Sequence, residues 1–148
     1  MSAVVRGISE RNMEERIHEY VRALEAVVKP EIAKSTGQFT HRCQTFALPS
    51  EAAKATLEEC YKIRSAVEHM NLVDDVFSGC SPAEIALRAG QRLRQIETLA
   101  FSVYLKLATS KAHAQIFETD TSINGFLAKR DDECRSAWGA PVNIETIE

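Results

Sequence analysis

The residues of this chain whose types and spacing point most clearly to chemistry are Arg64 and His69. They lie five positions apart in the stretch LEECYKIRSAVEHMN, residues 57–71. An imidazole can move the proton of a ribose 2′-hydroxyl near neutral pH, and a guanidinium can stabilise charge developing on a phosphate. Cleavage of RNA by its own 2′-hydroxyl needs only these two groups. On spacing alone an ordinary alternative is favoured, in which Arg64 pairs with Glu68 or another carboxylate and His69 ends a helix.

The spacing also limits how the two side chains can meet. A five-residue step on a continuous helix turns about 140°, so Arg64 and His69 do not stack as an i, i+4 pair would. They can flank one patch if the helix ends or bends near His69, or if a second copy of the chain completes the site.

Helical periodicity positions this pair. We expect Ser50 to cap a helix from about Glu51 to Asn71, with an apolar stripe at Leu57, Cys60, Ile63, Val67 and Met70. An earlier helix is predicted to begin at a Ser9 cap and to bury Met13, Ile17, Val21, Leu24 and Val28. Pro30 then opens a second helix that runs to about Phe46, with Ile32, Phe39, Cys43 and Phe46 on its apolar side.

The second half of the chain reads as one long helix followed by short ones. Ser81-Pro82-Ala83-Glu84 combines an N-cap serine, a first-position proline and a capping-box glutamate. The stripe that follows predicts the longest helix, with Ile85, Ala89, Leu93, Ile96, Ala100, Val103 and Leu107 buried. Shorter helices are expected around residues 112–117, 122–129 and 131–138, with Trp138 anchored on the bundle.

No stretch has the period-two alternation typical of strands, so the sequence predicts an all-α fold. We expect an up-and-down bundle of four main helices with short extra C-terminal helices. A single domain is predicted over residues 9–140, between a flexible tail at 1–8 and a C-terminal tail at 141–148.

Composition indicates a globular protein of ordinary size. The chain has 148 residues, 45% of them hydrophobic, and a net charge of −3, which argues against wholesale electrostatic binding of nucleic acid. The four cysteines are too far apart for a metal site, and Cys43 and Cys60 suit buried free thiols. No signal-peptide or membrane-spanning run is present in the sequence, so a cytoplasmic location is expected.

Three other groups of polar residues have types or spacings that could bind a ligand. Glu15 and His18 have the Glu-x-x-His spacing of di-iron bundles, but without a second such pair we predict no metal and no cofactor. His41 and Arg42 could bind an anion, although pairing within the chain is the simpler reading. A run of basic residues between Arg88 and Lys111 is read as a solvated face.

The segment from Arg64 to His69 resembles the Rx4-6H motif of HEPN domains, and Tyr61-Lys62-Ile63 before the arginine is similar to the Apea-like branch of that family. The resemblance implies a homodimer whose paired motifs form a metal-independent endoribonuclease for single-stranded RNA, in a toxin or defence role. In that setting Arg64 would contact the scissile phosphate and His69 would act as acid or base, with Ser65, Tyr61 and Glu68 in support.

The alternative is a non-catalytic HEPN-type module that dimerises or binds RNA or a protein partner such as an antitoxin. The position after the arginine is usually Asn, Asp or His in active family members, and here it is Ser65. Ser65 and the acidic overall charge therefore favour this alternative.

Overall fold

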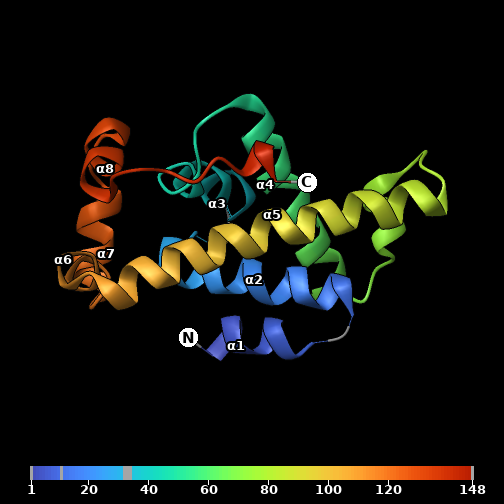
Figure 1. Cartoon of the computed structure of the whole chain (residues 1–148), viewed down its shortest axis with the longest axis horizontal. Helices are drawn as coiled ribbons and strands as arrows, with labels where there is room; N and C mark the ends of the chain where they lie inside the picture. Colours follow the sequence, from blue (N-terminus) through green and yellow to red (C-terminus); the bar gives the residue numbers. More distant parts are fainter. Residues whose placement is uncertain (1, 11, 32–34, 148) are drawn as a thin grey trace.

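A computed structural model describes residues 2–10, 12–31 and 35–147 (Figure 1). Over these ranges the chain forms eight α-helices and two short 3₁₀ helices and has no β-strand beyond one isolated bridge, so the expected all-α bundle is confirmed. No helix among these residues is both long enough and apolar enough to cross a membrane.

Helix α2 (Met13–Val28) is the centre of the bundle. It packs against α1 (Ser2–Ser9), α4 (Glu51–Glu68) and α5 (Pro82–Thr109), the longest helix, as Figure 1 shows for α1 and α5. The expected apolar face of α2 is confirmed, since four of its five predicted residues are fully buried: Ile17, Val21, Leu24 and Val28. The core therefore lies where α2, α4 and α5 meet.

Two of the predicted helix starts are confirmed by hydrogen bonds. The Ser50 hydroxyl accepts from the N–H of Ala53 at 2.9 Å at the start of α4. At the start of α5, Ser81 and Glu84 form the full capping box, with the Ser81 N–H donating to the Glu84 carboxylate at 2.7 Å. Along α5, five of the seven predicted stripe residues are buried: Ala89, Leu93, Ile96, Ala100 and Val103.

Residues 2–8 of the predicted flexible tail belong instead to helix α1, and residue 1 lies outside the described residues. Val4 is buried, and Gly7 allows α1 to lie directly on the ring of Tyr20. The first long helix consequently does not begin at Ser9, which ends α1. Its cap is Asn12, whose side-chain oxygen accepts from the N–H groups of Glu14 and Glu15.

The second predicted helix is shorter than expected. Helix α3 (Ser35–Cys43) neither begins near Pro30 nor reaches Phe46, and the predicted position Ile32 lies outside the described residues. The chain leaves the helix after Cys43 because Phe46 and Leu48 exchange backbone hydrogen bonds with Val142 instead, at 2.8 and 2.7 Å. Phe39 and Phe46 are nevertheless buried, as predicted.

The three short C-terminal helices are confirmed as α6 (Lys111–Ile116), α7 (Asp120–Leu127) and α8 (Asp131–Trp138), which stack at one end of α5 (Figure 1). Trp138 anchors them, because its ring is buried and lies 4.5 Å from that of Phe46.

The segment predicted as a C-terminal tail is instead part of the bundle. From Gly139 the chain runs back to the 3₁₀ helix η3 (Ile144–Thr146), where Ile144 is buried and its carbonyl accepts from the side chain of Gln95 at 2.9 Å. The domain therefore extends to at least Thr146.

Candidate functional site at the end of helix α4

Helix α4 ends at Glu68, so His69 lies just beyond it, which is one of the two arrangements in which Arg64 and His69 could flank one patch. The N–H of Asn71 donates to the carbonyl of Ala66 at 2.9 Å and the N–H of Met70 donates to that of Val67 at 3.2 Å. These two bonds, with Met70 in the left-handed conformation at φ 55°, form a Schellman motif. The chain then turns into the 3₁₀ helix η2 (Val73–Phe77).

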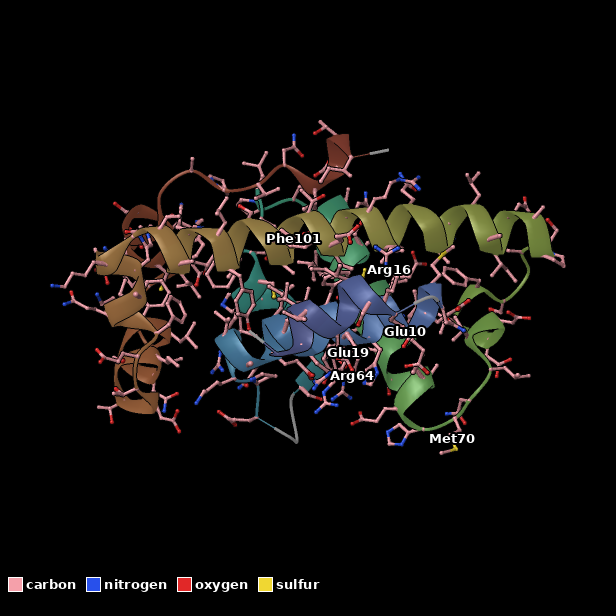
Figure 2. All side chains as sticks on the ribbon, turned by 60° about the horizontal axis from the view of Figure 1, so that its bottom comes forward. Glu10, Arg16, Glu19, Arg64, Met70 and Phe101 are labelled. Atoms are coloured by element: carbon pink, nitrogen blue, oxygen red, sulfur yellow. The ribbon has the colours of Figure 1, made fainter. Side chains whose placement is uncertain are left out.

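This ending corrects the predicted apolar stripe. Leu57, Cys60 and Ile63 are fully buried as expected, but Met70 is 95% exposed. The periodicity continues in the sequence after the helix has stopped, so Met70 points away from the core (Figure 2).

Arg64 is held by two carboxylates of its own chain. Its Nε and Nη2 atoms lie 3.2 and 3.1 Å from Oε2 of Glu25 on α2, and its Nη1 atom pairs with Glu68 one turn further along α4. The guanidinium also lies over the ring of Tyr61, 5.5 Å from its centre. Because only 16% of the Arg64 side chain is exposed, most of this ion pairing takes place out of bulk water.

Tyr61 lies beside the Arg64 ion pair, whereas Ser65 does not. Burial raises the pKa of Tyr61, whose hydroxyl hydrogen-bonds with the side chains of Ser35 and Glu25. Ser65 lines a separate shallow depression together with Lys62, Ala66, Asn71, Leu72, Asp75 and Val76. Tyr61 therefore supports the ion pair, whereas Ser65 faces a different surface.

His69 is exposed and caps α4 through its backbone N–H, which donates to the Ser65 carbonyl at 3.1 Å. Its imidazole makes no hydrogen bond or ion pair with any residue that the structure describes. Within this part of the chain no direct contact joins the ring to Arg64. The Arg64 guanidinium is therefore ion-paired within the chain, whereas the His69 imidazole is exposed to solvent.

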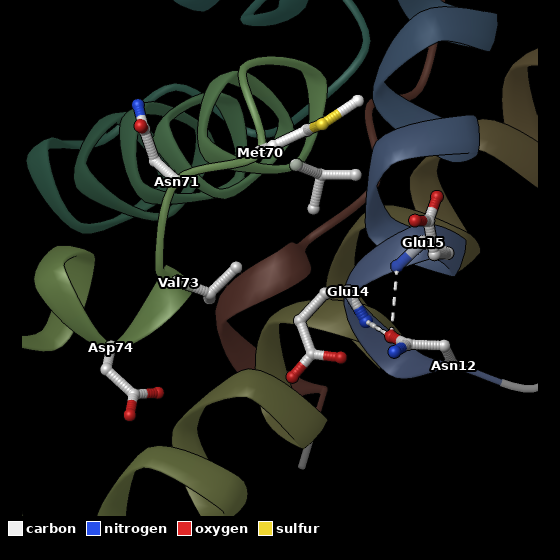
Figure 3. Close-up of a pocket in the computed structure, with 8 residues that line it drawn as sticks. Asn12, Glu14, Glu15, Met70, Asn71, Val73 and Asp74 are labelled. Atoms are coloured by element: carbon white, nitrogen blue, oxygen red, sulfur yellow. Dashed lines mark hydrogen bonds between the residues drawn. The ribbon is translucent and has the colours of Figure 1, made fainter.

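An acidic depression lies next to this helix end, between the start of α2 and η2 (Figure 3). It has a volume of about 430 Å³, and its lining includes the carboxylates of Glu14, Glu15 and Asp74. Among the described residues, the imidazole of His18 lies 3.8 Å from the Glu15 carboxylate.

His41 and Arg42 lie in a different part of the bundle. The Arg42 guanidinium donates to the carbonyls of Val28 and Lys29, at 2.8 and 2.6 Å, and so closes the C-terminal end of α2. His41 lies 3.2 Å from Asp131. Both residues of the predicted anion site have partners within the chain.

Three cations of the basic run, all on α5, are paired within the chain. Arg88 and Arg92 both contact the buried carboxylate of Glu59, at 2.7 and 2.5 Å. Lys106 donates to the carbonyl of Trp138 at 2.7 Å and stacks on its ring. These cations hold helices together and do not form a stripe that could follow a phosphate backbone.

The Glu15–His18 pair gathers no further ligands. Among the residues described, no three histidines, cysteines or carboxylates come close enough together to hold a metal ion. Both ring nitrogens of His18 are buried without a hydrogen-bond partner.

Sequence reasoning missed Glu25, the main partner of Arg64. The two residues are 39 positions apart and come together only because α2 packs on α4. The only local signal was that Glu25 lies next to the predicted apolar face of its helix.

No protein-family model, curated protein or solved structure matches this chain. Its function must therefore be inferred from its residues and their geometry.

Proposed function

We propose that the chain is a HEPN-type helical module that binds a partner and does not cleave RNA by itself. The observation that carries this proposal is the double ion pair of Arg64, whose guanidinium already faces Glu25 and Glu68. The resemblance of the Arg64–His69 segment to the HEPN motif supports the family, and the charge around Arg64 favours binding over catalysis.

A scissile phosphate would meet an unfavourable charge at this position. Two carboxylates and one guanidinium leave a net charge of −1, and Nε, Nη1 and Nη2 each already have an acceptor. Removing one partner from a buried ion pair costs about 3–5 kcal/mol, so exchanging Glu25 for phosphate is disfavoured. Glu68 is easier to displace, because 41% of its side chain is exposed.

The test is RNA cleavage by the purified protein in the presence of EDTA, with His69→Ala as the matched control. We expect no cyclic-phosphate ends above background from either protein. Cleavage by the wild type that His69→Ala abolishes, with helicity unchanged, would overturn the proposal.

The second candidate is a metal-independent endoribonuclease formed by a homodimer. The exposed imidazole of His69 favours it, since an acid or base must reach solvent and substrate. In that case Glu68 has to swing away when RNA binds, and Glu68→Gln should raise the cleavage rate.

A cytoplasmic setting in a toxin or defence system remains part of the proposal. The cytoplasmic part is supported by four cysteines that are all free thiols, and the toxin or defence role rests on the family resemblance alone. Burial raises the pKa of Cys60 to about 12, which keeps this thiol protonated and unreactive.

A further inference from the structure

We draw no further inference here: the strongest candidate, the surface patch that the exposed apolar side chains of Phe101 and Leu105 form one turn apart on α5, carries no proposal because nothing in the part of the chain that the structure describes shows what covers it.

Discussion

Replacing Met70 with glycine should make the protein more stable, although the change removes a whole side chain. The residue sits at φ 55°, and a left-handed conformation costs a non-glycine residue about 1–2 kcal/mol. Glycine loses more chain entropy on folding, by about 0.5–1 kcal/mol relative to alanine. The 95% exposed side chain contributes little burial that could be lost. The expected gain in the free energy of unfolding is therefore about 0.5–1 kcal/mol.

Urea unfolding followed by far-UV circular dichroism would measure this gain as a higher midpoint with an unchanged slope. Met70→Ala is the matched control, because alanine removes the long side chain but keeps the backbone cost, and it should lie within about 0.5 kcal/mol of the wild type. A Met70→Gly protein no more stable than Met70→Ala would refute the account of how α4 ends.

Three further predictions test other parts of the structure. Gly7→Ala would place a Cβ atom 2.9 Å from the buried ring of Tyr20, so it should cost about 1–3 kcal/mol and speed hydrogen exchange in α1; unchanged exchange would mean that α1 is not docked. Arg64→Met should lower the free energy of unfolding by about 2–4 kcal/mol, because it leaves the carboxylate of Glu25 unpaired. Adding Glu25→Gln should recover most of that loss. No recovery would show that the two residues are not coupled. Burial raises the pKa of Tyr20 from 10.0 to about 12, so the unfolded chain loses the phenol proton at a lower pH than the folded chain does. The free energy of unfolding should therefore fall as the pH rises from 10 to 12. Tyr20→Phe should show a shallower fall, and an identical pH profile would contradict this assignment.

Local signals in the sequence were enough to predict most of the helices. Ser50 and the Ser81–Glu84 capping box mark helix starts through contacts within three residues, and these were confirmed. Helix α1 was missed because a helix of eight residues is marginal alone and forms here by packing on α2.

The surroundings of Arg64 could be predicted only in part. Pairing with Glu68 follows from i, i+4 spacing and is present, whereas Glu25 comes from another helix and no local pattern announces it. The apolar periodicity predicts a buried Met70 because a periodic pattern contains no information about where the helix ends. The Schellman turn stops it two residues earlier, in a conformation for which the sequence offers no glycine.

Whether the Arg64 guanidinium stays paired with its carboxylates in the presence of RNA can be measured most directly by NMR of its Nε–H group during a titration with single-stranded RNA. If Glu25 and Glu68 satisfy the guanidinium, this signal should be protected from exchange with water and should not move, and neither should the ring signals of His69. Joint movement of the Arg64 and His69 signals at saturable RNA concentrations would contradict the account and establish a shared RNA site.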